Sequence, residues 1–160
     1  MALRIRAVLP GEAGLLSDLA LRSKAHWGYS QEFIAACRHE LTFTPEQIIG
    51  NTLQFIAAET EGDLLGFYAL EQVSATEFEL QALFVEPRHI GSGVGRTLIA
   101  HAKCAVAQAG GKVLRIQGDP HAERFYRAAG GMLVGQKESA SFPGRFLPMF
   151  AITFDAPATT

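Results

Sequence analysis

The chain has 160 residues, of which 48% are hydrophobic and 19% charged, and its formal net charge is −2. This length and balance suit one compact domain and exclude a disordered chain, so we treat residues 1–160 as a single domain. The small negative charge excludes a broad basic field, so we expect no nucleic-acid partner. Residues 1–8 have no apolar h-region, and no apolar run nears the roughly 20 residues of a spanning helix. We therefore expect a cytoplasmic protein without a membrane partner.

The first fifty residues predict one strand and three helices. Residues 3–8 alternate in period two, as in a strand. An apolar stripe at helical spacing follows Pro10, which predicts a first helix that ends near His26. Ser30 is a cap for a second helix through about Leu41, and Thr44 followed by a proline begins a third.

The rest of the chain predicts a mixed sheet with helices on its faces. We expect strands over residues 53–59, 64–73, 77–85, 112–117, 132–138 and 146–154, and helices from about 94 to 109 and 120 to 129. Three successive strands argue against a wholly parallel sheet. The predicted fold class is α/β, with a mixed, mostly antiparallel central sheet and flanking helices.

A glycine-rich segment, residues 88–96, lies between the predicted strand 77–85 and the helix that follows it. Gly91, Gly93 and Gly95 let backbone amides approach a ligand, and the helix N-terminus favours an anion such as pyrophosphate. Arg88 and Arg96 supply local positive charge. A glycine-rich turn without a ligand is the alternative.

Two familiar phosphate-binding motifs do not fit this segment. The dinucleotide fingerprint that starts at Gly91 requires glycine where Arg96 stands. The nucleoside-triphosphate loop requires glycine at Ile90 and lysine at position 96.

Two blocks resemble the GNAT superfamily of N-acetyltransferases, which depend on acetyl-CoA. Residues 88–93 are similar to the family signature Arg/Gln-x-x-Gly-x-Gly/Ala, which grips the pyrophosphate of coenzyme A. Residues 119–130 are similar to Asn-x-x-Ala-x-x-Phe-Tyr-x-x-x-Gly, with Asp119 in place of the usual asparagine. An ionised aspartate accepts hydrogen bonds but donates none, so this contact differs from the family's. Residues 83–87 also resemble the family's fourth strand.

The resemblance implies a GNAT-like acyl-CoA N-acyltransferase fold whose fourth and fifth strands splay apart. Pantetheine would lie along the fourth strand, where backbone groups left unpaired need partners. The resemblance implies acetyl-CoA, or coenzyme A, as a co-substrate and no metal. The implied coenzyme-binding residues are Leu83, Phe84, Val85, Arg88, Ile90, Gly91, Ser92, Gly93, Val94, Gly95, Arg96, Thr97, Asp119, Ala122, Phe125 and Tyr126. An amide near Leu83 would also stabilise the oxyanion.

The reaction also moves protons, and the family assigns residues to this task. An alkyl amine has a pKa of roughly 10.4, so a base must help to remove its proton. Glu79 stands where several GNAT enzymes carry such a glutamate; a solvated strand carboxylate is the alternative. Tyr126 matches the tyrosine that protonates the departing thiolate; a core aromatic side chain is the alternative.

The two cysteines do not form a metal or disulfide motif. Cys37 and Cys104 both lie in amphipathic stretches, and we expect both to be buried free thiols. Neither has a convincing histidine partner, so we expect direct transfer without an acyl-enzyme.

The acceptor side is predicted from one aromatic loop and one arginine. His26, Trp27 and Tyr29 stand between the first two helices, where this fold borders its acceptor cleft, and can stack on a ring or a cation. Arg145 can bind a carboxylate. Packing at a helix junction and a solvated side chain are the respective alternatives.

Three functions remain open at this stage. The first, which we favour, is acetyl transfer through a ternary complex to a small-molecule primary amine. The second is a protein or peptide acetyltransferase, acting on N-terminal amines or lysine. The third is a non-catalytic acyl-CoA sensor. A homodimer is left open.

Overall fold

The computed structural model describes residues 2–154. Its elements are β1 (Arg4–Ala7), η1 (Pro10–Glu12), α1 (Ala13–Ala25), α2 (Gln31–Cys37), α3 (Pro45–Ile49), β2 (Leu53–Thr60), β3 (Asp63–Gln72), β4 (Glu77–Val85), η2 (Pro87–His89), α4 (Val94–Gln108), β5 (Val113–Gln117), η3 (Pro120–Ala122), α5 (Glu123–Ala128), β6 (Met132–Glu138) and β7 (Phe146–Thr153).

Within the described residues, seven strands form one sheet in the order β1-β2-β3-β4-β5-β7-β6. Strands β4 and β5 are parallel, and every other neighbouring pair is antiparallel. The mixed, mostly antiparallel sheet with flanking helices is therefore confirmed.

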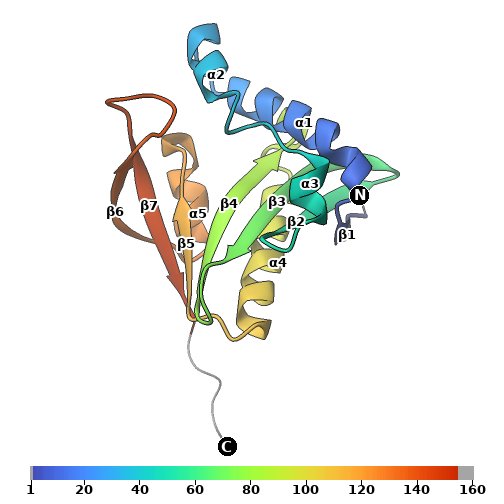
Figure 1. The fold of residues 1–160 in the computed structure, drawn as a ribbon, viewed down its shortest axis with the longest axis vertical. Coiled ribbons are helices and arrows are strands. Elements are labelled where there is room, and N and C mark those ends of the chain that lie inside the picture. Colours follow the sequence, from blue (N-terminus) through green and yellow to red (C-terminus); the bar gives the residue numbers. More distant parts are fainter. Residues whose placement is uncertain (1, 155–160) are drawn as a thin grey trace, which may run out of the picture.

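Each face of the sheet carries its own hydrophobic core. On one face, Leu16 and Leu19 of α1 and Phe33 of α2 pack against side chains of β2 and β3. On the other, Val94 and Leu98 of α4 pack against the opposite side of the sheet. Figure 1 shows α1, α2 and α3 on one side of the sheet and α4 on the other. The helices begin where short polar side chains cap them: the hydroxyls of Ser30 and Thr44 accept hydrogen bonds from the first turns of α2 and α3.

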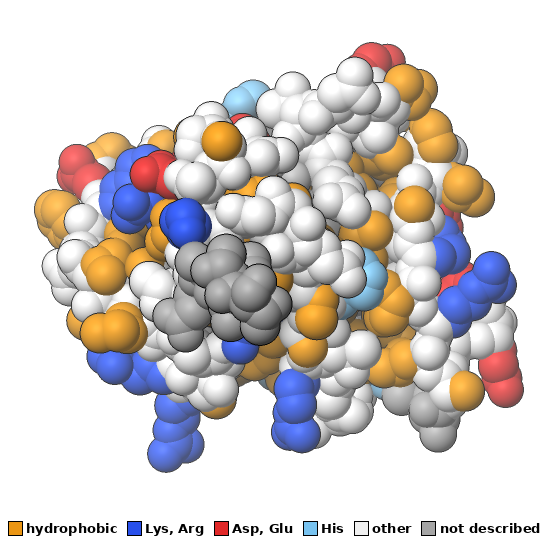
Figure 2. All heavy atoms as spheres, turned by 90° about the horizontal axis from the view of Figure 1, so that it is seen from below, with side chains coloured by type: hydrophobic (Ala, Val, Ile, Leu, Met, Phe, Trp, Pro, Cys, Tyr) orange, Lys and Arg blue, Asp and Glu red, His pale blue; other side chains and the backbone are white. Residues whose placement is uncertain are grey.

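The far edge of the sheet is exposed. All seven residues of β6 are exposed, including Met132, Leu133 and Val134, at 68%, 44% and 58%. Figure 2 shows hydrophobic side chains at the left of the molecule, the side on which β6 lies in Figure 1. In the part of the chain described, no helix is long and apolar enough to cross a membrane.

Candidate active site

The central feature of the site is a cleft between β4 and β5. The two strands pair from Glu77–Val113 to Leu80–Ile116 and then part, while β4 continues to Val85. Figure 1 shows them diverging toward the end where α2 lies. The expected splaying of the fourth and fifth strands is thus present. A cavity of about 680 Å³ occupies this region, lined by residues 80–85 of β4 and by Gln117, Gly118 and Asp119 after β5.

A β-bulge turns the side chains of β4 where the strands part. Leu70 of β3 pairs with Leu80 and Ala69 with Ala82, which leaves Gln81 without an opposite residue. As a result, Leu80 faces the core beneath α4, while Ala82 faces the core beneath α1. Beyond Leu80, backbone groups that face away from β3 have no strand to pair with. A ligand with its own amides, such as pantetheine, can satisfy them.

The glycine loop forms an anion cradle at the start of α4. Gly91 and Gly93 have φ angles of +86° and +99°, in the left-handed region that favours glycine, and Gly93 is the N-cap. A Cβ atom at either position would have no heavy atom within 4 Å. Amides of the first turn of this 15-residue helix lack carbonyl partners within it, so the cradle fits a pyrophosphate group.

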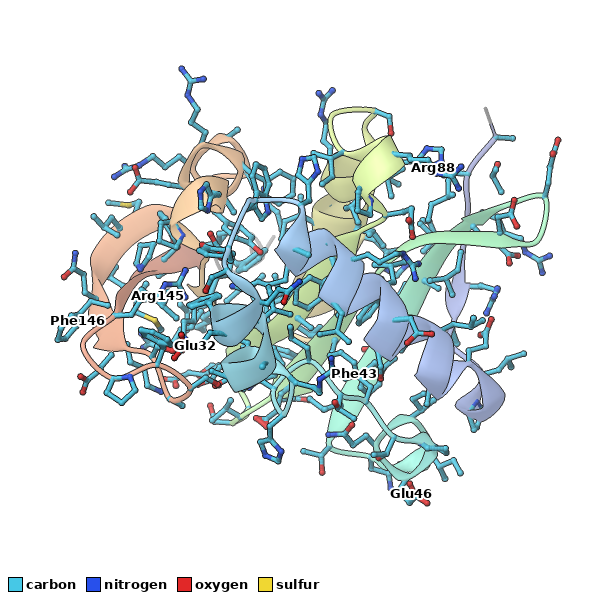
Figure 3. The ribbon with its side chains drawn as sticks, turned by 90° about the horizontal axis from the view of Figure 1, so that it is seen from above. Glu32, Phe43, Glu46, Arg88, Arg145 and Phe146 are labelled. Carbon is cyan, nitrogen blue, oxygen red and sulfur yellow. The ribbon has the colours of Figure 1, made fainter. Side chains whose placement is uncertain are left out.

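The other loop residues support this geometry. Arg88 and Arg96 are exposed, and Figure 3 shows Arg88 beside the start of α4. The Ser92 and Thr97 hydroxyls instead donate to the carbonyls of His89 and Gly93, so they stabilise the loop itself. Gly95 has a packing role, because a Cβ there would approach Phe125 to 3.1 Å.

Tyr126 lies on the cleft and not only in the core. Its side chain is 7% exposed, packs against Phe150 and lines the cavity together with Ala122 and Phe125. Burial raises its pKa above the ordinary value, and the charge of Asp119 adds to this effect. The raised pKa keeps its hydroxyl protonated, and because the hydroxyl makes no hydrogen bond among residues 2–154, it can donate to a ligand in the cavity.

Glu79, the expected base, is less well placed. It lies in the paired part of β4, opposite Glu71 on one side and Arg115 on the other. Its carboxylate accepts a hydrogen bond of 2.9 Å from Gln81. Gln81 is among the residues that line the cavity, and Glu79 is not.

Asp119 is held by side chains from several parts of the chain. Its carboxylate accepts hydrogen bonds from Lys24 (2.6 Å), Tyr29 (2.9 Å) and the backbone N–H of His121 (2.9 Å). The Nδ1 atom of His121 lies 2.9 Å from it, and Arg145 lies 3.4 Å away. Burial by itself raises the pKa of Asp119, but the hydrogen bond and charge of Lys24, with bonds from His121, hold it well below its usual range. The sequence suggested a contact to pantetheine; here Asp119 is the centre of a protein network.

The predicted acceptor residues divide into two groups. Trp27 lines the cavity and stacks on His121, with ring centroids 5.1 Å apart and an interplanar angle of 11°. His26 packs edge-on against Trp27 and does not line the cavity. Tyr29 and Arg145 are bound to each other at 2.7 Å, so neither is free in the way the sequence suggested.

The β6–β7 segment also packs against α2. The guanidinium of Arg145 lies 4.7 Å from the ring centre of Phe33 in α2, and Phe142 packs against the same ring at 5.3 Å. Figure 3 shows Arg145 between the β6–β7 segment and α2. Burial, and then the negative charge of Asp119, raise the pKa of Tyr29 to about 12. Its hydroxyl therefore stays protonated and donates to Asp119.

Two residues that sequence reasoning missed belong to this site. Lys24 stands in the last turn of α1, 95 positions from its partner Asp119, and no local pattern predicts that pairing. His121 lies inside the block that resembles the family motif, but at a variable position of it. The expectation that both cysteines are buried was wrong for Cys104, which is exposed on α4; Cys37 is buried.

The comparisons with known proteins agree with this geometry. The family model described as "Acetyltransferase (GNAT) domain" matches residues 51–130, from β2 to the end of the block after β5. The chain therefore belongs to the GNAT acetyltransferase family. The sequence matches no curated protein at a significant level.

Three solved structures illustrate the shared fold. PaiA N-acetyltransferase from Thermoplasma acidophilum, in complex with coenzyme A, is 18% identical with a TM-score of 0.76, covering 96% of this chain and 100% of its own. A GCN5-related N-acetyltransferase from Rhodopseudomonas palustris is 18% identical with a TM-score of 0.78, covering 96% and 97%. An aminoglycoside 6'-N-acetyltransferase complexed with coenzyme A is 21% identical with a TM-score of 0.73, covering 97% and 99%. At these identities the likeness extends to the fold alone.

Proposed function

We propose that this protein is an N-acetyltransferase that moves an acetyl group from acetyl-CoA directly to a primary amine, through a ternary complex. The observation that carries the proposal is the parting of β4 and β5 after Leu80 and Ile116, next to the glycine loop at the start of α4. One continuous surface thus offers unpaired strand backbone for pantetheine and helix amides for pyrophosphate.

The residues of this surface have separate tasks in the proposal. The amides around Gly91 and Gly93 hold the pyrophosphate, and Arg88 and Arg96 add positive charge. In the proposal, the backbone amide of Leu83, a residue that lines the cavity in the open part of β4, donates to the oxyanion that forms when the amine attacks. The Tyr126 hydroxyl protonates the departing sulfur.

The hydrogen-bond network around Asp119 favours a small acceptor over a peptide. Hydrogen bonds from Lys24 and Tyr29 to Asp119 tie α1 and the α1–α2 loop to the end of β5. Arg145 adds the β6–β7 segment to the same cluster. An extended peptide would have to displace this network to run through the cleft, whereas a small amine would not.

A sensor without catalysis is the weaker alternative. Tyr126 lines the cavity with an unengaged hydroxyl, which a binding module does not need. Both cysteines are free, which supports a reducing, cytoplasmic setting for the enzyme.

The direct test is thiol release from acetyl-CoA with a panel of amines: amino acids, polyamines, aminosugars, arylalkylamines, and lysine and N-terminal peptides. The proposal expects amine-dependent release with at least one small amine, and initial-rate lines that intersect. Release with peptides alone would instead indicate a protein or peptide acetyltransferase. Tight acetyl-CoA binding without release across the panel would favour the sensor.

A further inference from the structure

The environment of His121 fixes which of its ring nitrogens carries a proton. Nδ1 lies 2.9 Å from a carboxylate oxygen of Asp119. Asp119 also accepts from the Lys24 ammonium at 2.6 Å, so it is ionised and can only accept. A contact of 2.9 Å between Nδ1 and an acceptor requires a hydrogen on Nδ1.

The Tyr29 hydroxyl does not donate its proton to Nδ1 of His121. Its hydroxyl is within 3.0 Å of both Asp119 and Nδ1, but its single proton goes to the carboxylate, and its oxygen accepts from Arg145 at 2.7 Å. The neutral imidazole of His121 therefore carries hydrogen on Nδ1 and a free lone pair on Nε2.

The ring is also held in place and remains open on one side. Trp27 stacks flat on it and Tyr29 meets it edge-on, with ring centroids 5.1 and 5.3 Å away. His121 lines the cavity, and its side chain is 41% exposed. Nε2 lies on the side of the ring away from Asp119, and in the described part of the chain it has no hydrogen-bond partner.

The structure assigns to His121 the role of general base for the amine, directly or through one water, with Asp119 as its positioning residue. This inference rests on the function proposed above. As the nitrogen attacks the thioester carbon, the N–C bond forms, and the proton leaving nitrogen passes to Nε2. The C–S bond then breaks, and the sulfur takes a proton from Tyr126. Both side chains exchange protons with water to complete the cycle.

The charged groups around His121 are compatible with this role. Asp119 follows β5, Lys24 comes from α1, Tyr29 from the α1–α2 loop and Arg145 from the β6–β7 segment. His26 packs edge-on against Trp27, the ring that stacks on His121. Glu79, the base that family resemblance suggests, lies outside the cavity lining and is bound to Gln81.

The test compares His121→Gln with the matched control Glu79→Gln in the full chain, using the best amine from the panel. We expect His121→Gln to lower kcat about 10²-fold at neutral pH, the lower end for loss of a general base. The acidic limb of the pH profile of kcat should disappear. Acetyl-CoA affinity and the thermal midpoint should change little, and Glu79→Gln should retain the limb and kcat within threefold.

Two further results decide the inference separately from the proposed function. A His121→Gln protein that keeps both kcat and the limb, while Glu79→Gln loses them, would overturn the inference and leave acetyl transfer intact. Nitrogen-15 NMR of the imidazole provides a readout that needs no activity: the inference expects the Nδ1–H tautomer, and an Nε2–H tautomer would contradict it. Absence of transfer by the parent protein to any amine would instead count against the proposed function.

Discussion

The Nζ atom of Lys24 lies 2.6 Å from the Oδ2 atom of Asp119, and this contact joins the end of α1 to the end of β5. The two side chains are 15% and 16% exposed, so water screens the pair only in part. The link matters because β5 has already parted from β4 at this level. A side-chain network thus supports the open end of the cleft where the sheet no longer does.

Asp119→Asn should destabilise the protein in a pH-dependent way. The substitution removes the negative charge that Lys24 and Arg145 share, and an unsatisfied buried partner costs about 1–3 kcal/mol. Because the folded state holds the pKa of Asp119 well below its usual 3.8, its contribution is full above that value, begins to fall below it, and is lost only as pH passes through the lower folded-state pKa. Denaturant unfolding should therefore show a larger difference between parent and variant at about pH 7 than near pH 3. An equal difference at both pH values would contradict the network.

Gly93→Ala should weaken acetyl-CoA binding, and Gly110→Ala provides the control. Both glycines flank α4, have positive φ (+99° and +80°) and have open space where a Cβ would lie. Each substitution should cost about 1 kcal/mol of stability through left-handed strain. Only Gly93 belongs to the cradle, so calorimetry should show roughly tenfold weaker acetyl-CoA binding, about 1.4 kcal/mol, for that variant alone. Equal losses of affinity in the two variants would contradict the assignment of the pyrophosphate site to the glycine loop.

Tyr126→Phe should lower kcat and leave binding nearly unchanged. Phenylalanine keeps the packing of the ring against Phe150 and removes only the hydroxyl. Loss of a general acid costs about 10²–10⁴-fold in rate. The measurement is kcat with thermal stability on the same preparation. A kcat within twofold of the parent, with a lower melting temperature, would show that the residue serves the core alone.

The double variant Cys37→Ala, Cys104→Ala should keep its kcat. Burial raises the pKa of the Cys37 thiol, which makes the nucleophilic thiolate scarce, and Cys104 lies exposed on α4 outside the cavity lining. Initial-rate patterns should intersect for the parent and for the variant. Parallel double-reciprocal lines would point to an acyl-enzyme.

The sequence predicted the fold well because its signals are local. The bounds of β4 and β6 agree with their predicted ranges, and Ser30 and Thr44 cap the helices that they were expected to cap. The second helix was predicted to continue to about Leu41 but ends at Cys37, where turns take over. Apolar periodicity alone does not distinguish a helix from a series of turns that bury the same side chains.

The site was only partly predictable for a related reason. The glycine loop and Tyr126 stand in continuous segments with recognisable spacing, so the sequence identified them. The network around Asp119 joins residues 24, 29, 119, 121 and 145, which only the folded sheet brings together. For the same reason Arg145 was interpreted as free to bind a substrate, whereas Tyr29 and Asp119 already hold it.

The central claim is direct acetyl transfer from the cleft between β4 and β5, and isotope-labelled acetyl-CoA tests it most directly. The protein is incubated with an amine and with acetyl-CoA that carries an isotope label in its acetyl group. The masses of the amine and of the intact protein are then measured by mass spectrometry. The account predicts one labelled acetyl group on the amine for each thiol released, and none on the protein. Label retained on the protein, or thiol release without labelled amine, would contradict it.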